Sequence, residues 1–591
     1  QPARAMELYQ IADKWVRALA VPEHPATDGR EGRFVGTALV LRLDGQIVGR
    51  GSSCGDDGQT MARAARAAIT EATSRLPDTN DALAAGQHLS LAPRLRISLE
   101  FSGTLVPITP ATFTELDVEI PCGLVGLAAR IGSTTAAVFP ASMLTTGTLP
   151  SDALASAISS ATGDPTAAIK LNAKAQPPQI AADRNATFYR FSTTHLAQLA
   201  PDAQPIFLFR GGKLISTREI TTARLRAFAD HLADYLMRWS ESRRVDSGWP
   251  QSTYHPTRGI HDPTVASLAE YAVAAYAMHR YLAIKARFQT GGDSDWKWTR
   301  EVTPDIARPR FGPERLSQQP LGNATPGPVF GSLRALVAMS PMESRPANSA
   351  QTLAALAPLE SDLAAAFSAE TGGEWSKDIP ENGRAFVAFV LTRRATLFPD
   401  ASDAITRRGT AEAAVRSVYR DAKPTNLVMH MPYLGWAELL LAGDTAAQIP
   451  AGAALRDMRE IVWQHQLTAA DAGADGPDLV GGIVFTGSSN RFPTAQSLRP
   501  LAFLATMVGD ARLTDPPEVM REISHQLEAL RFIRQLSLDE FAARDAVDPP
   551  TALWGIRAGL WDNRQAPEAT ALALLTVCET LRSLDEIAKR K

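Results

Sequence analysis

The segment Val265–Phe288, VASLAEYAVAAYAMHRYLAIKARF, carries apolar residues at i, i+3, i+4 and i+7 along its whole length. This spacing places apolar side chains on one face of an α-helix, so the segment predicts a long amphipathic helix. From about residue 221 to the C-terminus the same pattern returns between short polar joints. Further segments with this pattern are Leu225–Met237, Leu353–Phe367, Ala385–Leu397, Leu427–Leu441, Leu455–Leu467, Leu498–Met507, Val519–Leu536 and Ala569–Ile587.

Prolines divide this array at places where a proline can open a helix at its first turn, such as Pro263, Pro493 and Pro567. The pattern predicts about eleven to thirteen helices, which is the number that a closed double ring of helical hairpins needs. No repeat of fixed length is present, which disfavours a regular solenoid. We therefore expect a ring of helices whose joints gather around a concave surface.

The first third of the chain has a different pattern. Gly36–Val48 reads as two strands joined by an Asp44-Gly45 turn, which is a strong hairpin signal. Helices are expected at Thr60–Ser74 and Ser151–Ser160, with further strands at Arg94–Phe101, Leu124–Ile131, Ala136–Phe139, Phe188–Thr193 and Pro205–Ile215. This mixture lacks regular βαβ units and indicates an α+β fold.

These patterns predict a multidomain protein with an α+β domain at 1–220 and an all-α, toroid-like domain at 221–591. An irregular insertion, rich in Pro, Gly and Arg, is expected at 291–327, where no periodicity is present. A chain of 591 residues is too long for one core, in agreement with two or three domains.

Composition excludes several classes of protein. The net charge of −3 leaves no basic excess for neutralising phosphates, so we expect no nucleic-acid partner. No apolar run reaches the length of a membrane span, and the best one, Leu427–Leu441, contains His430 and Glu438. The three cysteines form no metal-ligand pattern, and we predict neither a metal site nor a cofactor. The oligomeric state is left open.

The sequence opens on Gln-Pro-Ala without Met, which is compatible with cleavage after a signal peptide. A trimmed chain would start in the same way. We expect a secreted or periplasmic protein, with a cytoplasmic location as the alternative.

Residues 5–200 resemble the AMME-syndrome candidate-gene domain family, which has an α+β fold. The matching segments are FVGTALVLRLDG at 34–45, GRGSS at 49–53, the helix at Ala62–Ala72, the strand at Leu95–Leu99, and Gly132 with AVFP at 137–140. The family has a cysteine after its Arg-Gly pair. Aligning that pair on Arg50-Gly51 puts Ser52 at the position of the cysteine, so no role of that cysteine transfers. The resemblance implies a fold and no activity.

In its succession of amphipathic helices and short joints, the helical array resembles the α/α toroids of polysaccharide lyases, glycoside hydrolases, uronyl epimerases and terpenoid cyclases. The Gln-Trp repeats and Asp-rich motifs of terpenoid cyclases are absent. The resemblance favours a carbohydrate-active enzyme, by analogy of fold alone.

Three joints of the array carry the residues best suited to chemistry. The first, WPQSTYHPTRGIHD at 249–262, offers His255 and Tyr254 for proton transfer, Asp262 as a carboxylate, and Trp249 and Arg258 for holding substrate. The structural alternative is that Asp262-Pro263 opens a helix and the aromatic side chains pack helices together.

The second joint, 481–494, ends in SSNRFPT at a helix start. Asn490 and Arg491 are placed there to hold a carboxylate or a sulfate. Between the first and second joints, His430 and Tyr433 are three residues apart in Leu427–Leu441. On one helix they would share a face and form an acid/base pair.

The third joint, WGIRAGLWDNRQAPE at 554–568, offers Asp562 as a catalytic carboxylate and, for binding substrate, Trp554, Arg557, Trp561 and Arg564. The structural alternative is that Trp554 and Trp561 belong to a core and that Asp562 ends a helix.

Together these features predict a carbohydrate-active enzyme of the lyase or hydrolase type, acting on a polysaccharide or oligosaccharide in a groove of the toroid. A lyase needs a base such as His255 and an arginine to neutralise a uronate. A hydrolase needs two facing carboxylates. The alternative is a non-catalytic binding or assembly protein that uses the helical domain as a docking platform.

Overall fold

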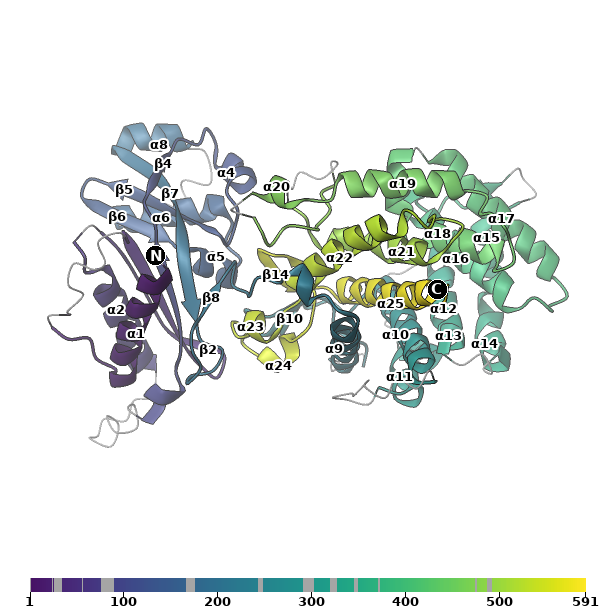
Figure 1. Ribbon diagram of the computed structural model, residues 1–591, viewed down its shortest axis with the longest axis horizontal. Coiled ribbons are helices and arrows are strands. Elements are labelled where there is room, and N and C mark those ends of the chain that lie inside the picture. The colour runs from purple at the N-terminus through teal and green to yellow at the C-terminus, as the bar shows by residue number, and fades with distance from the viewer. Residues whose placement is uncertain are drawn as a thin grey trace.

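The computed structural model in Figure 1 describes residues 2–23, 25, 34–55, 57–75, 90–165, 176–242, 248–290, 302–318, 327–344, 349–369, 373–422, 424–473, 476–485 and 492–590. A sheet-containing N-terminal part lies beside a larger helical part that contains the C-terminus. The chain is therefore a multidomain protein with both helices and strands, and this part of the sequence prediction is confirmed.

One antiparallel, eight-stranded sheet organises the N-terminal part. Its strand order is β2-β1-β3-β7-β5-β6, and β4 and β8 both pair with β7. The strands are β1 Gly36–Leu43, β2 Gln46–Cys54, β3 Arg96–Ser102, β4 Val106–Ile108, β5 Val125–Ile131, β6 Thr134–Val138, β7 Ala186–Ala197 and β8 Ile206–Leu208. The helices are α1 Pro2–Ala18, α2 Thr60–Arg75, α4 Phe113–Glu119, α5 Pro140–Thr146, α6 Pro150–Thr162 and α8 Pro177–Arg184.

The Asp44-Gly45 turn is confirmed. Leu43 pairs with Gln46, and both turn residues have positive φ, 50° at Asp44 and 86° at Gly45. A two-residue turn of this kind needs φ > 0 at both central positions, which Asp and Gly adopt at low cost. The helix α1 is not among the predicted elements. The three cysteines are free.

Two glycines of β2 let α2 approach the sheet closely. A Cβ at Gly51 would lie 1.9 Å from the carbonyl oxygen of Ala64, and one at Gly49 would lie 2.1 Å from that of Ala68. No side chain fits in such a space. The glycines around residues 49–55 thus serve the packing of a helix on a strand.

The helical part contains most of the predicted helices. They are α9 Thr222–Glu241, α10 Leu268–Thr290, α11 Pro304–Phe311, α12 Pro328–Met339, α13 Pro341–Ser344, α14 Ser349–Leu356, α15 Glu360–Ala366, α16 Glu381–Leu397, α17 Ala404–Asp421, α18 Tyr433–Ala442, α19 Gly452–Gln464, α20 Ala469–Ala472, α21 Leu498–Gly509, α22 Val519–Leu536, α23 Glu540–Ala543, α24 Pro549–Ala552 and α25 Pro567–Lys589. Most of them share one apolar core, in which α25 packs against α9, α10 and α21.

Two predicted helices are interrupted. Leu353–Phe367 is α14, a short 3-10 turn at Ala357–Leu359, and α15 followed by the two-residue strand β11 Phe367–Ser368. Leu427–Leu441 begins in a 3-10 segment, Pro424–His430, and α18 starts only at Tyr433. Each break contains a proline, whose missing N–H and ring end a preceding helix. His430 and Tyr433 therefore do not share one helix, and that prediction was wrong.

The insertion predicted to be irregular at 291–327 is ordered where the structure describes it. Residues 302–318 form α11 and a 3-10 segment, Pro313–Gln318. Ala307 and Phe311 of α11 are completely buried. They are four positions apart and so share one helical face. The helix is too short for this face to stand out as a periodic pattern. Residues 291–301 and 319–326 lie outside the described residues.

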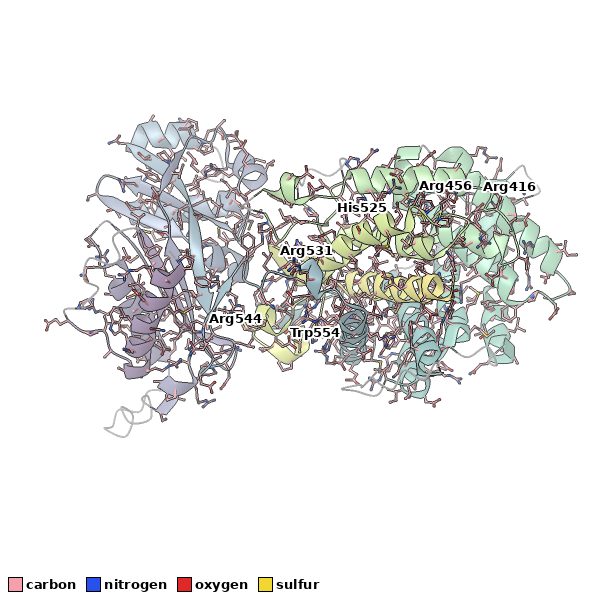
Figure 2. The ribbon with its side chains drawn as sticks, viewed as in Figure 1. Arg416, Arg456, His525, Arg531, Arg544 and Trp554 are labelled. Carbon is pink, nitrogen blue, oxygen red and sulfur yellow. The ribbon has the colours of Figure 1, made fainter. Side chains whose placement is uncertain are left out.

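Buried ion pairs join the N-terminal part to the helical part. Arg210, just after β8, donates to Asp478 at 2.7 Å, and both side chains are 1% exposed. Arg42 of β1 lies 3.1 Å from Asp545. Arg544, which Figure 2 shows at the junction, donates to the carbonyl oxygen of Gly211 at 3.0 Å. Buried pairs of this kind require precise geometry, so the two parts are held in one arrangement.

Candidate functional site

Two of the three chemically rich joints build one small sheet. Its four strands are β10 Ile260–His261, β9 Tyr254–His255, β14 Asp562–Gln565 and β13 Arg557–Gly559, in that order. Gln565 pairs with Tyr254, so His255 and Arg564 occupy neighbouring positions on adjacent strands. Segments about 300 residues apart in sequence therefore lie side by side.

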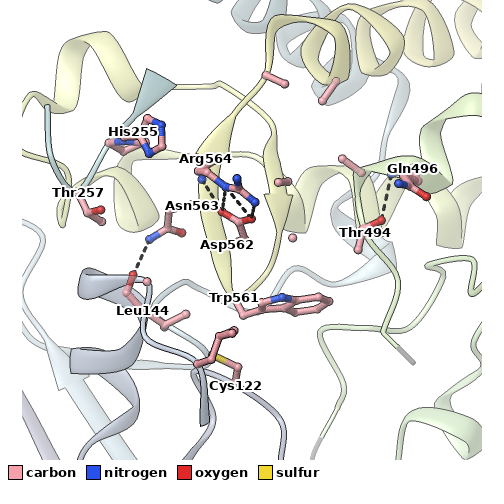
Figure 3. Close-up of a pocket in the computed structure, with 18 of the residues that line it drawn as sticks. Cys122, Leu144, His255, Thr257, Thr494, Gln496, Trp561, Asp562, Asn563 and Arg564 are labelled. Carbon is pink, nitrogen blue, oxygen red and sulfur yellow. Dashed lines mark hydrogen bonds and ion pairs between the residues drawn. The ribbon is translucent and has the colours of Figure 1, made fainter. Parts of the chain in front are cut away.

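A cavity of about 810 Å³ lies against this sheet, and we call it the joint cavity (Figure 3). Five segments of the chain line it, and two of them, Cys122 and 144–149, come from the N-terminal part. The lining includes Cys122, Leu144, 146–149, 255–258, 494–496, Arg499, 558–559, 561–564, Glu568, Ala569 and Leu572. All three predicted joints thus reach one cavity.

His255 and Asp262 form a pair at this cavity. The Nε2 atom of His255 lies 2.7 Å from Oδ1 of Asp262, and their side chains are 17% and 40% exposed. The tight β9–β10 hairpin sets the geometry: Gly259 has φ 66° and donates its N–H to the carbonyl oxygen of His255. A carboxylate that holds one ring nitrogen fixes the orientation and the tautomer of an imidazole.

The carboxylates of the third joint, Asp562 and Glu568, each lie close to an arginine. Arg564 donates from Nε and Nη2 to Asp562, at 2.9 and 2.6 Å from Oδ2. Hydrogen bonding to Asp562 raises the pKa of Arg564, and the charge of Asp262 adds to the effect. Arg499, at the start of α21, lies 3.8 Å from Glu568. Asp262 of the first joint and Arg564 of the third thus lie within electrostatic range of each other.

One wall of the cavity joins the two parts of the molecule. The indole of Trp561 is partly buried and meets the ring of Phe492 edge-on, at 5.4 Å between centroids. Asn563 donates to the carbonyl oxygen of Leu144 at the end of α5, at 3.4 Å. Arg258 lines the cavity with an exposed side chain. The aromatic ring, amide and guanidinium are suited to a polar, ring-shaped ligand.

Three predicted residues of these joints lie in the core instead. Trp249 is completely buried and donates to the carbonyl oxygen of Ala266 at 2.9 Å. Arg557 is 3% exposed and donates to backbone oxygens of Gln535, Leu536 and Leu560. The hydroxyl of Tyr254 is buried, which raises its pKa to about 12. A tyrosine with that pKa stays protonated near neutral pH and does not serve as a base.

Trp554 lies in a smaller cavity of about 310 Å³ between α9 and α22. Its indole stacks on the ring of His231, with centroids 4.0 Å apart and planes 3° apart. The guanidinium of Arg534 lies over the same indole, 4.3 Å from its centroid. Trp554 is thus separate from the other residues of its joint.

His430 and Tyr433 do not line the joint cavity. His430 is 4% exposed, burial lowers its pKa, and no described residue bonds its buried Nδ1. Tyr433 packs in an aromatic cluster with Phe386, Phe389 and Trp436. Burial raises the pKa of Tyr433 well above the ordinary value, with a smaller contribution from Glu568.

The predicted anion-binding residues Asn490 and Arg491 lie outside the described residues. The residues that follow them, 494–496, do line the joint cavity. Thr494 caps the short turn there by accepting the N–H of Gln496 at 3.2 Å. The second joint therefore reaches the cavity through its last residues.

Several cavity residues were not identified from the sequence. The 144–149 segment carries no chemical motif, and nothing in the sequence places it near residue 561. Arg499 is a cation at the start of an apolar helix, which is only a weak indication of a role in a site. Within the described ranges, no group of His, Cys, Asp and Glu side chains is arranged to hold a metal ion. None of the described helices combines the length and apolar character that a membrane crossing requires.

No known family model matches this chain, and no curated protein matches it. Among solved structures, it is similar to the crystal structure of an uncharacterized protein from Pyrococcus horikoshii, with 14% sequence identity and a TM-score of 0.25. The match covers 35% of this chain and 97% of that one. The resemblances to the AMME-syndrome candidate-gene domain family and to α/α toroids are not confirmed by these similarities and stay predictions.

Proposed function

We propose that the joint cavity is the active site of a carbohydrate-active enzyme that cleaves an acidic saccharide by elimination, a reaction of the lyase type. The observation that carries the proposal is the His255–Asp262 pair, held on one sheet beside Arg564 at an open cavity. A base next to a guanidinium supplies the two functions that proton abstraction beside a carboxylate needs.

In this reaction His255 takes the proton from the carbon next to the uronate carboxylate. The electron pair of that C–H bond forms a carbon–carbon double bond, and the glycosidic C–O bond at the neighbouring carbon breaks. The leaving oxygen takes a proton from solvent. Arg258, Arg499 and Arg564 are the cations of the cavity that can stabilise the negative charge developing on the carboxylate.

The carboxylates of the cavity favour elimination over hydrolysis. A hydrolase needs one carboxyl group that stays protonated, to protonate the leaving oxygen. Asp562 instead accepts two strong hydrogen bonds from Arg564, and Glu568 faces Arg499. Both carboxylates are thus engaged with guanidiniums and are placed to orient arginines.

We also infer that the helical part is an α/α toroid. This inference is supported by α21 and α25, which both begin at the joint cavity and run in the same direction, as the inner helices of such a ring do.

The experiment is a screen of polyuronates and neutral glycans with two readouts, the absorbance of the unsaturated product and the number of new reducing ends. Elimination gives both signals on a polyuronate. His255→Gln should abolish the absorbance signal, and His465→Gln, at the end of α19 and away from the cavity, should leave it unchanged.

Reducing ends without unsaturated product would replace the proposal by hydrolysis. Binding of a glycan with neither signal would support the non-catalytic alternative.

A further inference from the structure

A second cavity, of about 850 Å³, lies at the opposite ends of the same helices, and we call it the ring cavity. α21 and α25 begin at the joint cavity and end at the ring cavity. Further lining comes from α10, α13, α16 and α18, whose labels surround the C-terminal half of α25 in Figure 1. None of the residues predicted from the joints lines this space.

A continuous polar network ties these helices together around the cavity. It runs from the indole N–H of Trp436 through the hydroxyl of Thr506 to the carboxylate of Glu579, over 3.1 and 3.2 Å. From there it continues through Arg280 and Glu343 to Arg393. Each of the six helices contributes one member, so the network links all six at this end of α25.

Two of the carboxylates lie behind guanidiniums. Glu579 is 1% exposed and Glu343 is 11% exposed, whereas Arg280 is 21% and Arg582 is 29% exposed. The lining also contains Asp444, Asp510 and Glu586, so six arginines stand against five acidic residues. Beside Glu579, the cavity thus presents guanidiniums to its contents, and the buried carboxylates hold them in position. Buried carboxylates in this place fix the orientation of each guanidinium before a ligand arrives.

Two guanidiniums keep donors that no described residue uses. Arg280 donates from Nε to Glu579 at 2.6 Å and from Nη1 to Glu343 at 2.9 Å, which leaves Nη2. Arg582 uses Nε and Nη2 on Glu579, which leaves Nη1. Neither remaining nitrogen is among the buried, unpaired polar atoms. These nitrogens are therefore accessible, and both arginines share Glu579 as their anchor.

An aromatic wall completes the ring cavity. The rings of Tyr276, Phe389 and Trp436 lie 5.7 to 5.9 Å apart, and all three side chains line the space. These side chains are only 1 to 7% exposed, so they give the space an apolar wall. Such a wall and the two guanidiniums together fit a ligand with an apolar ring and an anionic group.

A purely structural role explains part of this arrangement. The ion pairs with Glu579 and Glu343 link neighbouring helices and so contribute to packing. That role accounts for the paired charges but not for an open space of this size beside them, nor for donors left without partners. Burial opposes ionisation of Glu343, yet Arg393 and Arg280 lower its pKa to about 2, so the network stays charged at ordinary pH.

We propose that the ring cavity binds a small organic anion, a carboxylate, sulfate or phosphate carried on a ring, with Arg280 and Arg582 on the anionic group and the aromatic wall on the ring. Guanidiniums bind all three groups through paired N–H donors. The site is separate from the joint cavity, and the proposal does not depend on the enzymatic activity.

The test is titration calorimetry of the full chain with benzoate, phenyl phosphate and phenyl sulfate, with benzyl alcohol as the uncharged probe. We expect one site per chain for at least one of the anions and much weaker binding of the alcohol. Arg582→Gln should weaken binding by about tenfold or more, because a charge-assisted hydrogen bond is lost. Arg408→Gln, at an exposed ion pair on α17, should have no effect.

Arg582→Lys keeps the charge beside Glu579 and serves if the glutamine variant does not fold. It should also bind more weakly, since an ammonium lacks the planar fork. Binding of the anions that is unchanged in both variants, or no binding of any anion at millimolar concentration, would overturn the proposal. His255→Gln should leave this binding unchanged, which separates the result from that of the activity screen.

Discussion

Asp262 decides which nitrogen of His255 can accept a proton. Because Nε2 lies 2.7 Å from the carboxylate, it carries the hydrogen in the neutral ring, and Nδ1 is left with a free lone pair. No described group bonds Nδ1. In the proposed reaction, Nδ1 is therefore the atom that meets the substrate, and Asp262 acts by positioning.

Replacing Asp262 with Asn tests this role. The amide can turn its N–H₂ group toward Nε2, which favours the wrong tautomer and removes the charge that stabilises the imidazolium. We expect kcat on the best polyuronate to fall by about a hundredfold or more, with KM changed little. Steady-state kinetics measures both. Asp400→Asn, at an exposed turn, should match the wild-type protein, and an unchanged kcat in Asp262→Asn would exclude the proposed role.

Glu100 makes the stability of the N-terminal part depend on pH. Burial raises its pKa to about 7, although Ala141 and Thr193 donate hydrogen bonds to the carboxylate. The pKa in the folded state lies above that in the unfolded chain. The stabilising contribution is thus complete below about pH 4.5 and is lost as the pH rises through 7.

We expect Glu100→Gln to remove this dependence. Relative to the wild-type protein, the variant should gain about 2.5 kcal/mol of unfolding free energy between pH 5 and pH 8. Urea unfolding at the two pH values measures this difference, with Glu412→Gln as an exposed control. Equal effects of Glu100→Gln at both pH values would show that Glu100 does not titrate in this range.

At the scale of single elements, the close contact between β2 and α2 is the most sensitive. We expect Gly51→Ala to destabilise the protein by about 3 kcal/mol, because the new methyl group would meet the carbonyl oxygen of Ala64. Gly409→Ala in α17 has free space and should instead stabilise the protein by about 0.5–1 kcal/mol. Chemical denaturation of both variants gives the comparison. Similar effects in the two would contradict the packing argument.

Elements were predictable from sequence where the contrast between apolar and polar positions is strong. Val519–Leu536 is found as α22 with the same bounds, and the hairpin at Asp44-Gly45 has the expected turn. In α17, by contrast, the buried face combines Ala411, Ala414 and Ser417 with only two larger apolar residues, Val415 and Val418, and Ile405 is 91% exposed. Small apolar side chains and an exposed isoleucine weaken the periodic signal, so α17 was missed.

The site was predictable to a similar degree. The joints were identified because His, Trp, Arg and Asp gather there, and the structure brings parts of all three to one cavity. Which members face the cavity was not predictable, because Trp249 and Arg557 look the same in sequence as Trp561 and Arg564. The ring cavity gave no clustered signal at all. Its members are single charges in apolar helices, and only tertiary packing brings Arg280 and Glu579 together.

For the whole molecule, the junction between the two parts determines the joint cavity, since the 144–149 segment forms one of its walls. We expect Asp478→Ala to destabilise the protein by about 3–5 kcal/mol, because it leaves the guanidinium of Arg210 buried without its carboxylate. Calorimetry should show one unfolding transition in the wild-type protein and a lower or divided transition in the variant. Glu412→Ala, which breaks an exposed pair with Arg408, should change stability by less than about 1 kcal/mol. An effect of Asp478→Ala no larger than this would show that the two parts are held together by other contacts.

The small sheet shared by the first and third joints also has a consequence for biosynthesis. β9 and β10 leave the ribosome about 300 residues before β13 and β14. His255 therefore lacks the strand that carries Arg564 while those residues are being made. The joint cavity can take shape only once the last helix of the array is being made. A nascent chain that is released early therefore carries the histidine and its carboxylate but no complete pocket around them.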